Sequence, residues 1–380
     1  MSARPRVAAV LVALALLAAG CGDSDDAGDT SSDSASASAS ASASASASAS
    51  EPASDSASAS ASEPASDSAS ASASEPASDS ASASEMADEC SGTYSFTSYS
   101  GDVEVPRNPE KIAVYDLGML TSFAELGIPI DAEDGVATLG TPLPADVEEL
   151  AGIPQSLGTV FEPDLEALNA MEPDLIVVAS RSSRLYPDFV DLGIAPVVDL
   201  TSFDEDVDFF EEFARTHRHI GEIFCVQDET EAVIADIQST IDSVNAVSPD
   251  AGDALVLVTT GAEVGAFGPG AFRFGQVYDN YGFLAADDSI AENETHGEPV
   301  SFEFIAEAEP DILFVVDRAA ATGEEGEAAA AILDNSLVNS TAAAENGQIY
   351  YVDPFNWYIV FNGIVGVRGV AEELAAAVGA

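Results

Sequence analysis

Two segments of the chain carry the same order of hydrophobic and polar positions, 137 residues apart. Residues 163–181 read PDLEALNAMEPDLIVVASR and residues 300–318 read VSFEFIAEAEPDILFVVDR, with six identities in 19 positions. Each copy begins with apolar residues at helical spacing, breaks at Pro-Asp and continues as an uninterrupted apolar run. Such a run is typical of a strand that is buried on both faces of a parallel sheet. The repeat therefore predicts an α/β protein with two similar lobes.

Further apolar runs supply the other strands of each lobe. We expect strands over Lys111–Tyr115, Leu175–Ala179 and Ala195–Asp199, and over Ala254–Thr259, Ile312–Val316 and Gln348–Asp353. Between the two sets, residues 221–247 keep a helical pattern with no internal Pro or Gly, and the pattern stops before Pro249. This predicts one long linker helix, whose stiffness would keep closure of the two lobes small.

The first 21 residues have the pattern of a signal peptide. Arg4 and Arg6 precede 14 small and apolar residues, a run too short to span a membrane as a mature helix. The run ends in Leu-Ala-Ala-Gly and Cys21, which resembles a bacterial lipobox, a signal whose cysteine becomes lipidated. We expect lipid on Cys21 to hold the protein on the membrane, because two or more acyl chains anchor a protein durably. An ordinary secretory signal with an incidental cysteine is the alternative.

Residues 22–89 are dominated by Ser and Ala, repeat the unit EPASDSASASAS, and contain 14 acidic residues and no basic one. Almost nothing in this segment can be buried, so we expect a disordered tether between lipid and folded body. The predicted organisation is a signal peptide (1–21), a tether (22–89), a first lobe (90–220), a linker helix (221–248) and a second lobe (249–380).

The charge balance excludes several classes of function. The chain has 67 acidic and 11 basic side chains, a net charge of −56, and the part from residue 90 onward carries −44. Such a chain repels phosphate backbones, which argues against nucleic-acid binding. The excess of acids suggests a salt-rich environment, where screening relieves the self-repulsion. No nucleophile elbow, Walker loop or HExxH motif occurs, so we expect no enzymatic activity.

Arginine is scarce in the body, so the position of each arginine is informative. Arg181 and Arg318 occupy equivalent places in the repeat, just after the predicted strand. Open α/β sheets bind ligands at the carboxyl ends of their strands, so each lobe would offer an arginine to a shared cleft. Pairing with local carboxylates is the alternative. His217 and His219 resemble a metal-binding pair, but we expect them on the surface because no third ligand is near in sequence.

Lipobox, tether, twin lobes and linker helix together resemble the helix-linked substrate-binding proteins of iron-siderophore ABC transporters, most closely those for catecholate siderophores such as petrobactin. The resemblance covers roughly residues 105–375. It rests on seven short motifs in order: Pro109–Asp116, Leu157-Gly158, Glu162–Asp164, the loop Gly268–Gly275, Thr295–Gly297, Phe314–Arg318 and Asp353–Tyr358. One departure is an extra residue in the loop before Arg273, where the family usually has GPGSRFG.

The resemblance implies a ferric siderophore as cargo, an ABC permease dimer as partner, no cofactor, and a lipid-anchored monomer on the extracytoplasmic face of the cell membrane. Its implied ligand-binding residues are Arg181, Arg273, Arg318, His296, Tyr358, Tyr115 and Trp357. Among these, His296 and Tyr358 would ligate iron directly where an incomplete chelate leaves two sites open, since imidazole and phenolate are good Fe(III) donors. For Trp357, packing in the core is the alternative.

The resemblance also implies that Glu166 and Glu303, equivalent in the repeat, dock onto permease arginines. A first-turn helix charge is the other interpretation of each. Cys90 and Cys225 would both lie outside the cytoplasm, where they could form a disulfide.

Other functions remain open on the sequence alone. The same fold could bind haem, cobalamin or a bare metal ion, although three scattered histidines argue against a bare metal site. A stalked cell-surface adhesion or structural domain would explain the tether, but it has no need of arginines at strand ends. A lipid-anchored siderophore hydrolase would require a nucleophile beside its base, and none is evident near His296.

Overall fold

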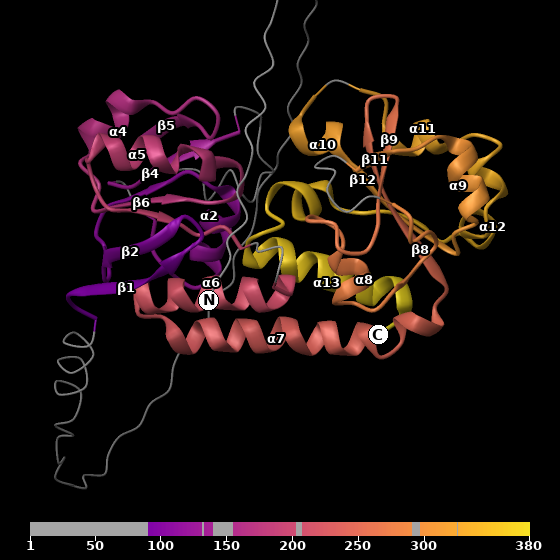
Figure 1. Ribbon diagram of the computed structural model, residues 1–380, viewed down its shortest axis with the longest axis horizontal. Coiled ribbons are helices and arrows are strands. Elements are labelled where there is room, and N and C mark those ends of the chain that lie inside the picture. Colours follow the sequence, from indigo (N-terminus) through magenta and orange to yellow (C-terminus); the bar gives the residue numbers. More distant parts are fainter. Residues whose placement is uncertain (1–89, 131–132, 140–154, 203–206, 291–296, 325) are drawn as a thin grey trace, which may run out of the picture. The chain divides into compact units, whose positions relative to one another are not determined.

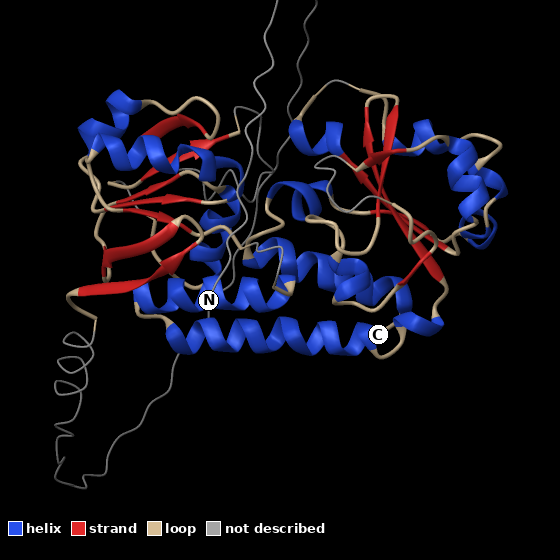
Figure 2. Ribbon diagram, in the orientation of Figure 1, coloured by secondary structure: helices blue, strands red, loops and turns tan. Residues whose placement is uncertain are grey.

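The computed structural model describes residues 90–380 apart from 131–132, 140–154, 203–206, 291–296 and 325. The predicted signal peptide with Cys21, the tether and His296 therefore lie outside the described residues. Two sheets, each accompanied by helices, account for most of the described chain (Figures 1 and 2).

The first lobe is built on a parallel sheet of five strands in the order β5-β4-β3-β6-β7. These strands are β3 (Ile112–Val114), β4 (Gly135–Thr138), β5 (Gln155–Thr159), β6 (Leu175–Val178) and β7 (Val197–Asp199). Helices α2 (Leu117–Glu125), α4 (Leu165–Met171) and α5 (Tyr186–Leu192) and the 3₁₀ segment η1 (Ser180–Leu185) follow strands. The strand order reverses beside β3, and such a switch point is where open α/β sheets bind ligands.

The second lobe has a mixed sheet of six strands in the order β11-β9-β8-β12-β13, with β10 also beside β8. Its strands are β8 (Asp253–Thr260), β9 (Glu263–Phe267), β10 (Leu284–Ala285), β11 (Glu298–Pro299), β12 (Ile312–Asp317) and β13 (Ile349–Tyr351). Its helices are α8 (Gln276–Asp279), α9 (Phe302–Ala308), α10 (Arg318–Thr322), α11 (Ala329–Leu333) and α12 (Ala342–Asn346), with the short segments η2 (Ser248–Asp250), η3 (Val338–Ser340) and the π-helical η4 (Phe355–Ile359).

The sequence repeat folds as helix, break and strand in both lobes. Helices α4 and α9 end at Glu172 and Glu309, which both adopt the left-handed conformation, with φ of 53° and 45°. The aspartate of each following Pro-Asp ties its strand to the first strand of the same lobe. Asp174 accepts the backbone N–H of Lys111 at 3.0 Å, and Asp311 accepts that of Asp253 at 3.1 Å. The repeat identities thus mark the junction that starts β6 and β12.

Alternate residues of the central strands enter different cores, which explains their uninterrupted apolar sequence. In β3, Ile112 and Val114 join a core that also contains helix α2, whereas Ala113 joins a core with residues of α4 and α5. In β12, Phe314 and Val316 join the first of these cores, and Leu313 and Val315 a third one. One core therefore receives one face of each sheet.

One long helix, α7 (Gln227–Asn245), leads from the first lobe to the second, but it begins later than the sequence predicted. The single helix predicted over 221–248 is wrong at its start: α6 (Phe209–Phe224) ends there, and α7 begins after a two-residue turn. Cys225 makes this turn in the left-handed conformation, with φ of 58°. Its sulfur forms a disulfide with Cys90, with an Sγ–Sγ distance of 2.06 Å. The apolar pattern continues through the turn because α6 and α7 pack side by side against the same core.

An antiparallel hairpin that the sequence did not predict precedes the first sheet. Its strands are β1 (Thr93–Ser98) and β2 (Gly101–Pro106). Tyr94 and Phe96 of β1 pack against α6, where the ring of Phe96 stacks on His219 with centroids 4.1 Å apart. The hairpin and the disulfide thus fix the start of the body to α6.

The chain ends in α13 (Ile364–Val378), which returns to the first lobe. It packs on α7 and α2, and Arg368 pairs with Glu125 at 2.5 Å. The second lobe predicted over 249–380 therefore includes a segment that contacts both lobes (Figure 1). Within the described residues, none of the helices combines the length and the apolar character needed to cross a bilayer.

Candidate functional site

Two equivalent strand ends deliver two of the predicted arginines. Arg181 follows β6 after Ser180, which takes the left-handed conformation with φ of 49° and so turns the chain into η1. Arg318 follows β12 as the first residue of α10, whose N-terminus Asp317 caps by accepting the N–H of Ala320. Both guanidinium groups therefore start from the carboxyl edge of a sheet, as the repeat predicted.

Three arginines gather around one tyrosine ring. The guanidinium carbons of Arg273, Arg181 and Arg318 lie 4.5, 5.3 and 5.9 Å from the centroid of Tyr358. Arg318 also donates from Nε to the Tyr358 hydroxyl at 3.1 Å. The aromatic face partly offsets the repulsion among the cations, because its quadrupole attracts positive charge. The structure thus brings together four of the predicted ligand-binding residues.

Arg181 reaches from the first lobe to the second. It donates to the carbonyl oxygen of Ile359 at 2.9 Å and to that of Tyr358. Its guanidinium and that of Arg273 also lie over the ring of Phe361, at 5.9 and 5.1 Å. The acceptors belong to η4, a π-helical turn, and such turns recur at functional sites.

Arg273 is the most unusual member of this cluster. Only 7% of it is exposed, and its Nε and Nη1 have no hydrogen-bond partner among the described residues. Burial lowers the pKa of Arg273 to about 10, and the neighbouring charge of Arg181 acts in the same direction. A buried cation with unpaired donors costs free energy unless an acceptor arrives. This geometry is suited to an anionic ligand.

The three arginines differ in their local partners. Arg318 pairs with Glu324 at 3.2 Å; burial acts to lower its pKa, but Tyr358 and Glu324 outweigh burial and leave the pKa above its ordinary value. Within the described part of the chain, neither Arg181 nor Arg273 has a carboxylate within ion-pair distance. Local pairing, the alternative raised by the sequence, therefore applies only to Arg318.

Tyr115 and Trp357 do not face open space. Tyr115 is fully buried against Phe189, with ring centroids 4.7 Å apart, and burial raises the pKa of its hydroxyl. Trp357 is fully buried near Phe274 and Phe314, and its indole N–H donates to Glu373 at 3.2 Å. Both rings are closed off from solvent in this structure, and contact of either ring with a ligand stays a prediction. Trp357 follows the alternative interpretation, packing in the core.

The predicted iron ligands are only partly described. Tyr358 is 5% exposed and lies inside the arginine cluster, whereas His296 lies outside the described residues. Across the described ranges, no three His, Cys, Asp or Glu side chains are placed to hold a metal ion together.

Glu166 and Glu303 lie in equivalent exposed positions. Each is in the first turn of its helix, α4 or α9, and each helix is N-capped by the side chain of Asp164 or Ser301. The two carboxylates are therefore available both to their helix N-termini and to a partner.

The expectation that both His217 and His219 are on the surface is wrong. His217 is fully buried in α6 and bonds to Ser122 at 2.9 Å and to the Phe213 carbonyl at 2.8 Å. His219, half-buried, bonds to the Tyr94 hydroxyl at 2.9 Å. They point into different surroundings because residues two apart on a helix do not share a face.

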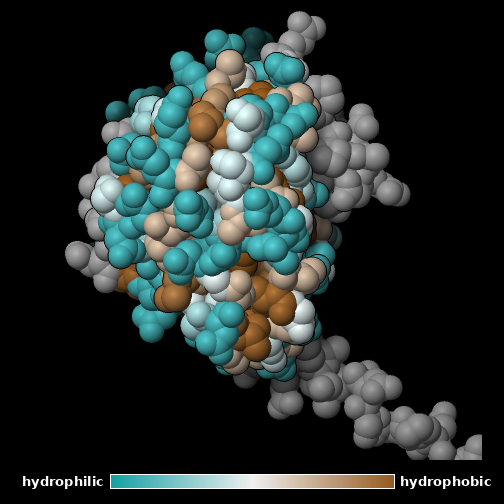
Figure 3. Space-filling model, turned by 90° about the vertical axis from the view of Figure 1, so that its right-hand side faces the viewer, coloured by the Kyte–Doolittle hydropathy of each residue, from teal (hydrophilic) through white to brown (hydrophobic). Residues whose placement is uncertain are grey.

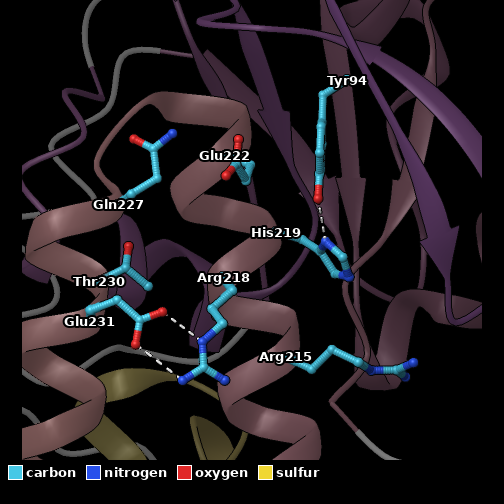
Figure 4. A pocket seen from close by; sticks show the side chains of 8 residues that line it. All are labelled: Tyr94, Arg215, Arg218, His219, Glu222, Gln227, Thr230 and Glu231. Atoms are coloured by element: carbon cyan, nitrogen blue, oxygen red, sulfur yellow. Dashed lines mark hydrogen bonds and ion pairs between the residues drawn. The ribbon is translucent and has the colours of Figure 1, made fainter.

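A pocket of about 330 Å³ beside the hairpin shares no lining residue with the arginine cluster (Figure 4). It is lined by Tyr94, Arg215, Arg218, His219, Glu222, Gln227, Thr230 and Glu231. Its arginines are already neutralised, since Arg218 makes two bonds to Glu231, at 2.6 and 3.1 Å, and Arg215 pairs with Glu212. The cluster around Tyr358, and not this pocket, is therefore the candidate binding site.

Comparison with known proteins decides the family. Residues 112–354 match the sequence profile of a family described as periplasmic binding protein. The chain belongs to this family. The match spans both lobes, α6 and α7, and the segment that carries Arg181, Arg273 and Arg318.

Several curated proteins are similar to this chain over most of its body. The petrobactin-binding protein YclQ of Bacillus subtilis is 31% identical over 274 residues, which are 71% of this chain and 83% of YclQ. The ferric-anguibactin-binding protein FatB of Vibrio anguillarum is 28% identical over 288 residues, 72% of this chain and 84% of FatB.

Solved structures agree with the fold. The crystal structure of YclQ superposes with a TM-score of 0.70 at 29% identity, covering 76% of this chain and 99% of that one. The catecholate-siderophore binding protein VctP of Vibrio cholerae superposes with a TM-score of 0.67 at 28% identity, covering 75% and 100%. The two-lobed α/β architecture predicted from the sequence is thus confirmed.

Sequence reasoning missed three residues that shape the site: Phe361, Asn362 and Asp116. Phe361 lies under two of the arginines, and Asn362 donates to Asp116 at 3.1 Å across the lobes. The only signal was position, because Asp116 follows β3 just as Arg181 follows β6.

Proposed function

We propose that this protein binds a ferric siderophore of the catecholate type outside the cytoplasm and delivers it to an ABC importer. The observation that carries the proposal is the convergence of three arginines from both lobes on Tyr358. Two buried nitrogens of Arg273 have no hydrogen-bond partner in the described part of the chain. The names of similar family members, which include binders of petrobactin and ferric anguibactin, support the same class of cargo.

The chemistry of such a cargo matches the cluster. A ferric catecholate complex is a compact anion with planar oxygen donors on its surface. Guanidinium groups suit it because their donor geometry is rigid and their charge is permanent. The body as a whole carries −44 and would repel an anion, so attraction depends on local positive charge. The three arginines are that charge.

Direct ligation of iron belongs to the same proposal. Where the chelate is incomplete, the phenol oxygen of Tyr358 and the imidazole of His296 would fill two open coordination positions, since both are good donors to Fe(III). Tyr358 Oη already accepts a hydrogen bond from Arg318 at 3.1 Å, which fixes its direction. Iron here is cargo, and we propose no resident cofactor and no enzymatic step.

Delivery to the importer depends on a membrane anchor and on a surface that docks onto the permease. Lipid on Cys21 and the tether over 22–89 would hold a monomer near the membrane. Glu166 and Glu303, exposed at equivalent helix starts in the two lobes, would each meet one subunit of a permease dimer. Two like carboxylates on pseudo-equivalent lobes fit a partner with twofold symmetry.

The binding test uses the full-length protein and the fluorescence of Trp357, the single tryptophan. Ferric petrobactin should quench it with saturation, whereas haem and cobalamin should not. Arg181→Ala should weaken binding by about 1–3 kcal/mol, the range for losing a charged hydrogen bond. Arg184→Ala is the matched control three residues away, because Arg184 lies over Phe161 at 5.0 Å and outside the cluster. Saturable quenching by haem or cobalamin, with none by ferric siderophores, would refute the proposal.

A second experiment separates cargo binding from delivery to the permease. Replacing Glu166 and Glu303 together by Lys should leave ferric petrobactin binding unchanged and abolish uptake of the complex by cells. Unchanged uptake would remove the two carboxylates from the docking surface.

A further inference from the structure

Asp116 is a buried carboxylate at the point where the two lobes meet. It follows β3 at the switch point of the first sheet and caps α2, accepting the N–H of Met119 at 3.0 Å. The same oxygen accepts Asn362 Nδ2 from the second lobe at 3.1 Å. Only 3% of Asp116 is exposed, so its charge is poorly screened by water.

Arg181 of η1 is the charged group that acts on Asp116, and its guanidinium lies over the ring of Phe361, the residue next to Asn362. The two side chains act on one another through their charges, although the guanidinium donates its hydrogen bonds to the carbonyls of Tyr358 and Ile359 instead. Around the carboxylate, α2 contributes backbone N–H groups, and the segment between η4 and α13 contributes the neutral amide of Asn362. Asp116 thus offsets the positive charge of Arg181, while the Arg181 guanidinium donates hydrogen bonds to backbone carbonyls.

We propose that Asp116 is the charge-setting residue of the arginine cluster: its buried negative charge limits how tightly the cluster holds an anionic cargo. The inference rests on the proposed function, because it concerns the same site. A cluster without this carboxylate would hold its anion more tightly and release it more slowly. For a protein that must hand its cargo to an importer, a limited affinity is an advantage.

The same geometry couples cargo to protons. Burial raises the pKa of Asp116 to about 6, against the opposing effects of its hydrogen bonds and of Arg181. An anion bound at Arg181 would repel the carboxylate and favour its protonated form. By reciprocity, protonation of Asp116 favours binding of the anion. Affinity should therefore rise as pH falls through the range in which Asp116 gains its proton.

The test compares the wild-type protein with Asp116→Asn, both full-length. Asparagine is a good N-cap and keeps an oxygen for Met119, so the substitution removes charge and little else. The quantity measured is the ratio of dissociation constants, wild type over variant, for ferric petrobactin between pH 5 and pH 8. Changes in the siderophore itself cancel in this ratio. At pH 8 the variant should bind at least about fivefold more tightly, from unit charges interacting at low effective dielectric, and the ratio should approach one at pH 5.

Asp199→Asn is the matched control. Asp199 is equally buried, at the end of β7, but its carboxylate accepts from the hydroxyls of Ser100, Ser183 and Thr201. Its ratio should not change with pH. A ratio for Asp116→Asn that stays at or below one at pH 8, or that does not vary with pH, would overturn the inference.

A second probe keeps the inference separate from the proposed function. If the wild type fails to bind ferric petrobactin, the proposed cargo is wrong, and the ratio is then measured with hexacyanocobaltate(III), a trianion whose charge is constant between pH 5 and pH 8. Tighter binding of this trianion by Asp116→Asn at pH 8 would support the charge-setting role alone. Absence of trianion binding to either protein would overturn that role as well.

Discussion

Arg273 suits the site to an anionic ligand but lowers the stability of the ligand-free protein. Its guanidinium is almost fully buried beside two other arginines, and two of its nitrogens lack partners among the described residues. Breaking a satisfied buried ion pair destabilises a protein, whereas replacing an uncompensated buried charge by an apolar side chain often stabilises it. The ligand-free fold therefore carries a cost that the cargo would relieve.

This cost leads to a prediction for Arg273→Met. Burial lowers the pKa of Arg273 to about 10, so the guanidinium is still charged at neutral pH, but its charge costs more free energy in the folded state than in the unfolded chain. Methionine removes the charge and keeps much of the volume, so the ligand-free variant should be more stable by about 1–3 kcal/mol. Chemical denaturation with and without ferric petrobactin would measure both effects, since the variant should also lose most ligand-induced stabilisation. A less stable ligand-free variant would contradict the interpretation.

At the residue scale, the sequence predicted the arginines but not their setting. Arg181 and Arg318 could be found because the repeat places both after a strand, and the carboxyl edge of a sheet is a binding edge. The bond between Asn362 and Asp116 joins residues 246 positions apart, so no local pattern contains it. Burial of Tyr115 and Trp357 was equally hidden, because aromatic rings suit a binding site and a core alike.

At the scale of elements, a buried histidine joins three helices. His217 of α6 donates from Nδ1 to the carbonyl of Phe213, which can only accept, so Nε2 of the neutral ring accepts the hydroxyl proton of Ser122 in α2. Ser122 Oγ in turn accepts the N–H of Ile364, the first residue of α13, at 2.9 Å. The arrangement needs a neutral imidazole in one tautomer.

The stability of this junction should depend on pH in a defined way. Burial lowers the pKa of His217 from 6.5 to about 4, so the unfolded chain binds the extra proton first, and stability is lost as pH falls from 6.5 towards 4. The loss amounts to about 3 kcal/mol. For Asp116 burial raises the pKa to about 6, so its contribution has the opposite sign and grows as pH falls from 6 towards 4.

The two contributions nearly cancel in the wild type, and single variants should separate them. His217→Gln keeps a donor and an acceptor but cannot gain the proton, so its stability relative to wild type should improve between pH 6.5 and pH 4. Asp116→Asn should lose relative stability over pH 6 to 4. Urea denaturation at four or five pH values would measure both differences, and parallel curves for wild type and His217→Gln would show that the imidazole does not titrate as its burial implies.

Prediction of elements succeeded where one pattern fills a whole element. The apolar runs gave β6, β8 and β12 within one or two residues, and the repeat gave α4 and α9. Prediction of elements failed where tertiary contacts determine the local structure. The break between α6 and α7 occurs at a left-handed cysteine held by a disulfide, in a segment whose apolar spacing continues. Short strands such as β4 and β5 contain glycine and polar residues and have little pattern of their own.

At the scale of the whole described body, the two lobes share more than a linker. Gly118 of α2 and Gly363 before α13 approach so closely that a Cβ on Gly363 would lie 2.2 Å from the Gly118 oxygen. One core receives a face of each sheet together with α2, α6, α7 and α13. Closure of the lobes around a cargo must therefore be small or must break these contacts, which supports the small motion expected from a stiff linker.

The charge of the molecule gives the last prediction. From residue 90 onward, the chain has 53 acidic side chains and only nine basic ones. Hydrophilic residues cover much of the surface of the second lobe that Figure 3 shows. Repulsion among the acids should destabilise the fold at low ionic strength, because unscreened charges act over about 30 Å at 0.01 M salt and only about 3 Å at 1 M. The melting temperature should therefore rise steadily from 0.01 M to 1 M KCl, as circular dichroism would record. Sucrose at matched osmolality is the control, since it stabilises proteins without screening. If sucrose raises the melting temperature as much as KCl does, or if KCl has no effect, charge repulsion is not what limits the stability of this body.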